Sequence, residues 1–149
     1  MGNKPEMSDS KLQPSMSASD ITAILQTAID HLQWISESEY PFKTFYWSDQ
    51  AVSRLTDEKL LELTQHPIDT NVKTVDLDSF FEFVTQPQDW YGDEEIETMK
   101  KYQQLVATLK QHLSDLKVYQ LGEIELDIYV VGQTSDKKLV GLATKAIET

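Results

Sequence analysis

The 149-residue sequence contains no cysteine. This absence excludes a disulfide scaffold and cysteine catalysis, and it fits a reducing compartment. Glycine is scarce as well: the five glycines form neither a GxGxxG nor a GxxxxGK[ST] loop, and no GxSxG elbow occurs. The three histidines, His31, His66 and His112, stand far apart and show no metal-ligand spacing. We therefore expect no cofactor and no metal site of the protein's own.

Long hydrophobic runs are also missing. No apolar segment approaches the ~20 residues that a membrane span needs, and the N-terminus has no signal-peptide core. Residues 1–17 are polar and serine-rich, which predicts a disordered N-terminal extension. Residues 18–149 have the length and composition of a single globular domain, and no membrane partner is expected.

Basic residues are few. Thirteen Lys and Arg stand against 25 Asp and Glu, which gives a net charge of −12 at pH 7 with histidine neutral. Direct binding of nucleic acid is not expected, because phosphate contacts need a basic face. A negative field instead attracts basic protein surfaces. Solubility alone also explains such a charge, so charge by itself does not decide the function.

The clearest structural pattern is the segment GEIELDIYVVG at 122–132. Apolar and acidic residues alternate there, which predicts a strand with one face in a core. The residues of its buried face are Ile124, Leu126, Ile128 and Val130. Beyond Asp127 both faces become apolar, so this half of the strand is predicted to be covered on both sides. The polar segment 133–138 predicts a turn, and 139–143 a second strand of a hairpin.

Apolar spacing predicts four helices. They cover about 20–36, a short segment after an N-cap at Thr56, 79–84 after an N-cap at Asp78, and 93–113. In the third helix, Phe80, Phe81 and Phe83 are all expected in the core. Trp34 lies off the apolar stripe of the first helix, so it is expected to be exposed or at a rim.

Three further strands are predicted from β-branched and aromatic composition, at 42–47, 72–76 and 118–121. The element order is then roughly α-β-α-β-α-α-β-β-β. Helices between non-adjacent strands, followed by a terminal meander, predict the α/β class and a sandwich with a mixed sheet.

Two predicted loops carry residues typical of a binding surface. In Ser36-Glu37-Ser38-Glu39-Tyr40, two carboxylates stand at a turn. In Asp89-Trp90-Tyr91, two aromatic residues follow an acid. Trp and Tyr are frequent anchors of protein interfaces. The alternative for Trp90 is a hydrophobic staple that folds back over the first turn of the long helix.

Close carboxylate pairs raise the possibility of acid–base catalysis. They are Glu37/Glu39, Asp76/Asp78 and Glu123/Glu125/Asp127. Such pairs arise by chance among 25 acidic residues, and the sequence offers no pattern of a nucleophile with its base. A carboxylate-based hydrolase is therefore a third-ranked hypothesis, and we do not expect an enzyme.

Several motifs in order resemble the nuclease A inhibitor family. They are SESEYPF at 36–42, VDLDSFF at 75–81, TQPQDWYGDEE at 85–95, VYQLGEIELDIYVVGQT at 118–134 and the terminal Glu148-Thr149. The similarity extends over nearly the whole chain after residue 18, apart from residues 48–71, where no family motif is recognised. It implies a three-layer α/β/α sandwich with a mixed sheet, a nuclease-inhibitor-like domain at 18–149, and a cytoplasmic, cyanobacterial protein.

The resemblance also implies a partner and a set of contacts. Family members inhibit a sugar-non-specific DNA/RNA endonuclease whose active site holds a divalent metal, so a one-to-one complex is expected. Glu37 matches the carboxylate that pairs with an arginine of the nuclease, and Trp90 matches the interface aromatic. Thr149 matches the terminal threonine that reaches the metal region of the nuclease. Glu39 and Asp89 are weaker candidates beside them.

The predicted function is competitive occlusion of the nuclease active site without chemistry. An anionic chain end takes the place of a phosphate near the metal, and carboxylates meet the basic residues around it. The alternative is an acidic adaptor on the same fold that binds a different basic protein, which the departure at 48–71 favours.

Overall fold

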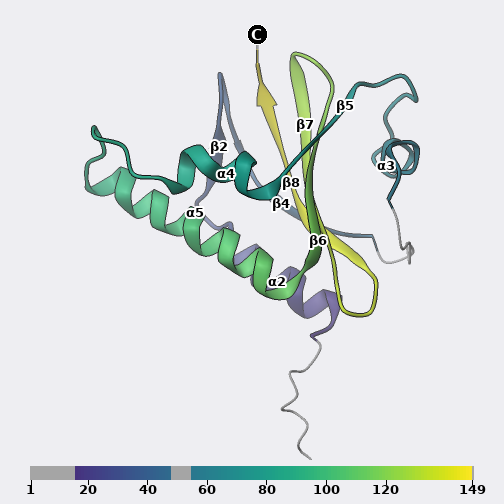
Figure 1. The fold of residues 1–149 in the computed structure, drawn as a ribbon, viewed down its shortest axis with the longest axis horizontal. Helices are drawn as coiled ribbons and strands as arrows, with labels where there is room; N and C mark the ends of the chain where they lie inside the picture. The colour runs from purple at the N-terminus through teal and green to yellow at the C-terminus, as the bar shows by residue number, and fades with distance from the viewer. Residues whose placement is uncertain (1–15, 48–54, 149) are drawn as a thin grey trace, which may run out of the picture.

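The structure is a computed structural model that describes residues 16–47 and 55–148 (Figure 1). Its elements, in chain order, are α2 (Ala18–Ala28), β2 (Gln33–Ile35), β3 (Glu39–Pro41), β4 (Lys43–Trp47), α3 (Asp57–Leu63), β5 (Val72–Val75), α4 (Leu77–Thr85), α5 (Asp93–His112), β6 (Ser114–Leu121), β7 (Glu125–Gln133) and β8 (Leu139–Ile147). Of the predicted N-terminal extension at 1–17, residues 1–15 lie outside the described residues. Ser17 is described and caps α2 through its hydroxyl, which accepts from the Asp20 N–H at 3.1 Å.

The main sheet has five strands in the order β4-β8-β7-β6-β5. Each neighbouring pair is antiparallel, so the prediction of a mixed sheet is wrong. Helical connections predicted parallel pairing, but α4 and α5 connect β5 to its antiparallel neighbour β6. The α3 connection joins β4 to β5, which point the same way but lie at opposite edges of the sheet and do not pair. The hairpin β7–β8 is confirmed: Glu125 pairs with Ile147 at one end and Gln133 with Leu139 at the other.

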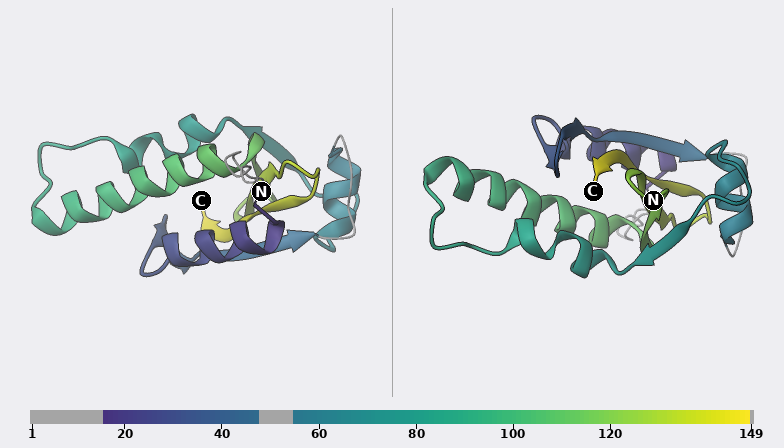
Figure 2. Two further views of the ribbon diagram at one scale, coloured as in Figure 1. Left: turned by 90° about the horizontal axis from the view of Figure 1, so that it is seen from below. Right: turned by 90° about the horizontal axis from the view of Figure 1, so that it is seen from above.

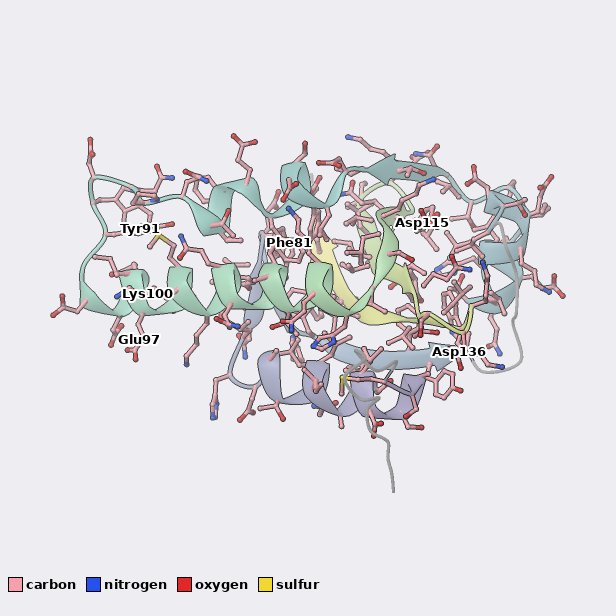
Figure 3. All side chains as sticks on the ribbon, turned by 60° about the horizontal axis from the view of Figure 1, so that its bottom comes forward. Phe81, Tyr91, Glu97, Lys100, Asp115 and Asp136 are labelled. Carbon is pink, nitrogen blue, oxygen red and sulfur yellow. The ribbon has the colours of Figure 1, made fainter. Side chains whose placement is uncertain are left out.

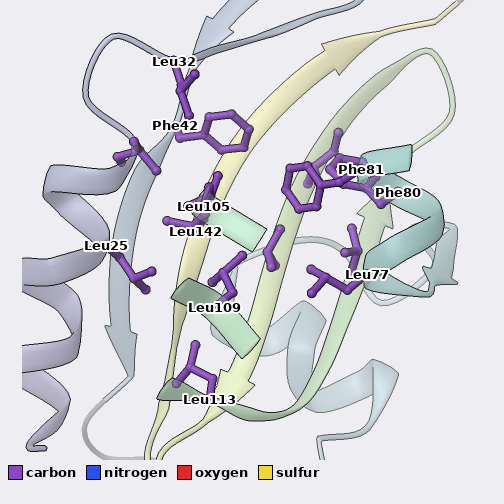
Figure 4. Packing of buried hydrophobic residues seen from close by; sticks show 14 of the residues in the cluster. Leu25, Leu32, Phe42, Leu77, Phe80, Phe81, Leu105, Leu109, Leu113 and Leu142 are labelled. Carbon is purple, nitrogen blue, oxygen red and sulfur yellow. The ribbon is translucent and has the colours of Figure 1, made fainter. Parts of the chain in front are cut away.

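Apolar side chains cover both faces of the sheet. On one face, α2, α4 and α5 pack on Leu126, Ile128 and Val130 of β7 and their neighbours (Figure 4). On the other face, α3 packs Leu60 and Leu61 against residues of β6, β7 and β8. The fold is thus mixed α/β, as predicted. The three-layer order stays a prediction, because in the described part of the chain a single short helix covers the second face in part.

The first helix is shorter than predicted, since it ends at Ala28 instead of near Ser36. His31 adopts a left-handed backbone with φ of 67°, which ends the helical path. The chain then forms the two-stranded hairpin β2–β3, with Trp34 paired to Tyr40. The Trp34 ring stacks on Phe80 with centroids 4.4 Å apart, so this aromatic contact draws β2 to α4 and replaces two further helical turns.

The predicted start of α4 is off by two residues. Asp76, not Asp78, is the N-cap, and its carboxylate accepts from the Ser79 N–H at 3.2 Å. Phe80 and Phe81 are in the core as predicted, but Phe83 is 66% exposed. Successive helix residues rotate by about 100°, so Phe81 and Phe83 point about 160° apart and cannot both face the sheet.

The two strands of the terminal hairpin also differ from prediction at their ends. Ile124 precedes β7 and is 58% exposed, so it is outside the predicted buried face. β8 continues to Ile147, four residues past the predicted end at Ala143. The longer strand extends the sheet to Ile147, next to the last described residue.

Candidate protein-binding surface

Glu37 lies at the tip of the β2–β3 hairpin. The tip is closed by the Ser36 N–H, which donates to the Ser38 carbonyl oxygen at 2.8 Å. The Glu37 N–H donates to the Ile147 carbonyl oxygen at 3.3 Å, and the Ile147 N–H donates to Ser36 Oγ at 3.0 Å. These bonds hold the hairpin tip beside the end of β8, so the exposed Glu37 stands next to the end of the sheet.

The end of β8 and the hairpin project at the same end of the molecule (Figure 1). The Glu148 N–H donates to the Ile124 carbonyl oxygen at 2.8 Å, which fixes the chain up to its last described residue. Thr149, the predicted terminal contact, lies outside the described residues. The structure gives the position of Glu148, the residue before Thr149, and the Thr149 contact stays a prediction.

Trp90 lies in the loop between α4 and α5. The loop ends in a turn in which the Tyr91 N–H donates to the Gln88 carbonyl oxygen at 3.1 Å. The Glu95 side chain then accepts from the Gly92 N–H at 2.9 Å and caps α5. The indole is 67% exposed and touches the Tyr91 ring edge-to-face at 4.8 Å. An indole so exposed contributes little as a staple, because a staple works by burying the side chain.

A groove of about 390 Å³ connects the hairpin with the Trp90 loop. Its lining residues are Gln33, Ile35, Phe83, Val84, Trp90, Tyr91, Glu94, Glu95, Thr98, Met99 and Tyr102. Figure 2 shows the hairpin and the α4–α5 loop as separate projections when the molecule is seen from above. We call the hairpin tip, the groove and the end of β8 the hairpin–groove surface.

The two weaker candidates are at the edges of this surface. Glu39 is exposed in β3 opposite Ile35, and it borders a shallow hollow at the hairpin tip. Asp89 is exposed beside Trp90 but is not one of the groove's lining residues. Glu37, Glu39, Asp89 and Trp90 are therefore all accessible to a partner.

The sequence did not predict Ile35 and Phe83 as surface residues of the groove. Ile35 belonged to the apolar stripe of a helix that ends earlier, and Phe83 was expected in the core. The helical rotation between Phe81 and Phe83 could have predicted that Phe83 is exposed. No local signal existed for Ile35, because β2 is a strand through its pairing with β3 and is held to α4 by the Trp34–Phe80 contact.

The floor of the groove is held by Tyr102 of α5. Its hydroxyl donates to the Gln33 carbonyl oxygen at 2.6 Å, which ties the long helix to β2. Trp34, on the inner side of β2, also contacts the Tyr102 ring edge-to-face at 6.3 Å. Burial raises the pKa of Tyr102 far above its ordinary value, because the phenolate would lose its hydration.

This burial predicts a loss of stability at high pH. Below the ordinary tyrosine pKa of 10.0, both the folded and the unfolded chain keep the Tyr102 proton. Above it the unfolded chain releases the proton first, so the free energy of unfolding falls as pH rises, by up to about 1.4 kcal/mol per pH unit. Urea unfolding from about pH 8 to about pH 11 measures this slope.

Tyr102→Phe is expected to reduce the pH slope and to cost about 1 kcal/mol at neutral pH through the lost hydrogen bond. Part of the slope should remain, because burial also raises the pKa of Tyr119 and Tyr129. Tyr46→Phe, at an exposed position, is the control and should keep the slope of the original protein. A slope equal in all three proteins would remove Tyr102 as its cause.

On the opposite face of the sheet, His66 links the end of α3 to β7. Its Nε2 lies 2.7 Å from Asp127 Oδ2, and its Nδ1 lies 2.7 Å from Thr64 Oγ1. The order hydroxyl–imidazole–carboxylate is that of a hydrolase triad. Thr64 Oγ1 is, however, 2.8 Å from the Leu60 carbonyl oxygen to which it donates, so the hydroxyl serves the end of α3. The chain of contacts anchors α3 on the sheet.

Over residues 16–47 and 55–148, no cluster of three or more His, Asp or Glu is arranged to hold a metal ion. Within the same part of the chain, no helix has the length and apolar character to cross a membrane.

Comparison with known proteins gives one family. The model of a family described as "Nuclease A inhibitor-like protein" matches residues 19–149. The match includes residues 48–71, where the sequence had offered no recognised motif. A search of the curated proteins gave no match.

Proposed function

We propose, from the premise that this chain belongs to the nuclease A inhibitor-like family, that it inhibits a metal-dependent, sugar-non-specific nuclease by occluding the active site. Such an active site binds phosphate with a hard metal ion and basic side chains. The inhibitor meets these basic groups with carboxylates and offers no bond to be cleaved. The partner is a nuclease, in a one-to-one complex.

One observation carries the proposal: the hairpin tip with Glu37 is hydrogen-bonded to the end of β8, at 3.3 Å and 3.0 Å. Two features more than a hundred residues apart are thereby joined into one rigid edge. An interface that inserts a carboxylate and a chain end into one active site needs this arrangement.

Each predicted contact has a role in the mechanism. Glu37 forms an ion pair with an arginine of the nuclease, and Glu39 and Asp89 add negative charge at the rim. Trp90 is the apolar anchor, since an exposed indole gains most from burial in an interface. Thr149 follows the anchored Glu148 and reaches the metal region, where its oxygens replace phosphate oxygens.

A stoichiometric titration of purified nuclease A tests this function. The residual hydrolysis of single-stranded DNA is measured as the chain is added to a fixed amount of enzyme. Loss of activity that saturates at one chain per enzyme supports inhibition by occlusion. Undiminished nuclease activity at a large excess of the chain contradicts it, and turnover of any substrate by the chain alone favours the hydrolase.

Glu37→Gln is a sharper test, because it keeps the size of the side chain and removes its charge. The Glu37 main-chain bond to Ile147 does not depend on the carboxylate and should persist. The melting temperature of the variant, measured on the same preparation, separates a change in binding from a change in stability. Inhibition should weaken roughly tenfold, as expected when an arginine of the partner loses its counter-charge in a buried interface. Glu62→Gln, at an exposed position of α3, should have no effect.

Electrostatic attraction should also set the rate of association. With a net charge of −12 and a basic partner, the association rate constant should fall roughly tenfold between about 50 mM and about 500 mM salt. Stopped-flow mixing with nuclease A measures it. An association rate that does not depend on salt would argue against steering by the acidic surface.

A further inference from the structure

Three of the large apolar side chains that are more than half exposed gather at one place. Ile35 is 69% exposed, Phe83 66% and Trp90 67%, and all three line the groove between β2 and the start of α5. They come from a strand, a helix and a loop, so local sequence does not explain their meeting. Apolar side chains gathered on a monomer surface are typical of a binding site.

The groove combines these apolar walls with negative charge. Glu94, exposed in the first turn of α5, lines it directly, and Glu95 lines it while capping Gly92. The lining residues include no lysine and no arginine. An occupant should therefore carry an apolar stem and a positive head.

The β2 and α5 sides of the groove are fixed before any partner binds. Trp34, the neighbour of Ile35, stacks on Phe80 at 4.4 Å, and Tyr102 donates to the Gln33 carbonyl oxygen at 2.6 Å. These contacts hold β2 against α4 and α5 at a set separation. A groove that is already formed costs little ordering on binding.

We propose that this groove receives an arginine side chain of the partner protein, with its methylene stem on Ile35 and Phe83 and its guanidinium between the Trp90 ring and the Glu94 carboxylate. A guanidinium is planar, weakly hydrated and stacks on aromatic rings, whereas an ammonium ion is compact and strongly hydrated. Long basic side chains also bury their stems along apolar surface.

A second copy of this chain is the less suitable occupant. The sequence contains one arginine, Arg54, and two copies with a net charge of −12 each repel one another. The nuclease, whose surface is basic where it binds nucleic acid, supplies arginine readily. Because the arginine is expected to come from the nuclease, the inhibition test of the groove rests on the proposed function.

The first experiment compares variants of the groove with matched variants elsewhere. Phe83→Ala and Glu94→Gln should each weaken inhibition of nuclease A roughly fivefold to tenfold, with melting temperatures unchanged. Ile68→Ala truncates an equally exposed side chain, 71%, near α3. Asp115→Asn removes one charge at the start of β6, at a distance from Tyr91 and the groove (Figure 3). Both controls should inhibit normally, and groove variants that inhibit as well as the controls would overturn the proposal.

The second experiment needs no nuclease. Acetylated Gly-Arg-Gly amide is titrated into the chain, and the three indole N–H signals are followed by NMR. The Trp90 signal should shift in a saturable way at millimolar peptide, with weaker binding of the lysine peptide and at least roughly fivefold weaker binding of the neutral citrulline peptide. Glu94→Gln should remove the difference between arginine and citrulline.

The outcomes of the two experiments separate the two hypotheses. If the chain binds the arginine peptide but does not inhibit nuclease A, the groove is an arginine site and the proposed function is wrong. If the chain inhibits nuclease A but binds the arginine and citrulline peptides equally, or binds neither, the groove is not an arginine site. Sedimentation at high concentration detects the remaining occupant: a dimer that Phe83→Ala dissociates would overturn the proposal in favour of self-association.

Discussion

Trp90→Ala is expected to weaken inhibition of nuclease A about 30-fold, which corresponds to about 2 kcal/mol. Trp90 is 67% exposed in the free chain, so an interface can still bury most of its side chain. Its loss removes the largest apolar anchor of the hairpin–groove surface. The inhibition constant and the melting temperature, measured on the same preparation, check the prediction.

The fold should tolerate this change. The ring contacts Tyr91 at 4.8 Å, and the cap of α5 depends on Glu95 and Gly92 instead. Ile68→Ala is the control for the loss of exposed apolar surface. If Trp90→Ala lowers the melting temperature while inhibition per folded molecule stays the same, the indole is a staple of α5 and not an anchor.

A second large effect is expected at Thr149. We expect a protein made with Glu148 as its last residue to inhibit at least about tenfold more weakly than one that ends at Thr149. A tenfold loss of inhibition corresponds to about 1.4 kcal/mol of binding free energy. Truncation removes the hydroxyl and moves the terminal carboxylate. A tag fused after Thr149 should do at least as much harm, because it neutralises the carboxylate and adds bulk in a closed site. Titration against nuclease A measures both.

The sheet should be little affected by either change. The hydrogen bonds at this end of β8 involve Ile147 and Glu148, although the strand reaches closer to Thr149 than the sequence predicted. A tag placed before residue 1 is the control and should leave inhibition unchanged. Equal inhibition by the two tagged proteins would remove Thr149 from the mechanism.

Strong local patterns were sufficient for most elements of the fold. The alternation before Gln133 predicted β7 and its hairpin partner, and Thr56 was correctly identified as the cap of α3. The periodicity of Met99, Tyr102 and Leu105 predicted α5. In each case the residue pattern and the observed burial agree, because a half-buried strand or helix must repeat its apolar residues with its own period.

The sequence by itself also determined the family, through long motifs in a fixed order, and with it the candidates Glu37 and Trp90. It determined the net charge of −12 and hence the kind of partner to expect. It could not determine whether these residues lie on one surface, because they belong to elements far apart along the chain.

Only the tertiary structure decided three matters. The sheet is antiparallel, since strand direction follows from how the connections cross and not from the strands' composition. Residues after Ala28 form a hairpin, because the pairing of β2 with β3, the Trp34–Phe80 stack and the Tyr102–Gln33 hydrogen bond together outweigh a helical stripe that would otherwise continue. That hairpin brings Glu37 to the end of β8 and Ile35 to the groove of Trp90. The hairpin–groove surface thus depends on long-range packing, which no local period of the sequence encodes.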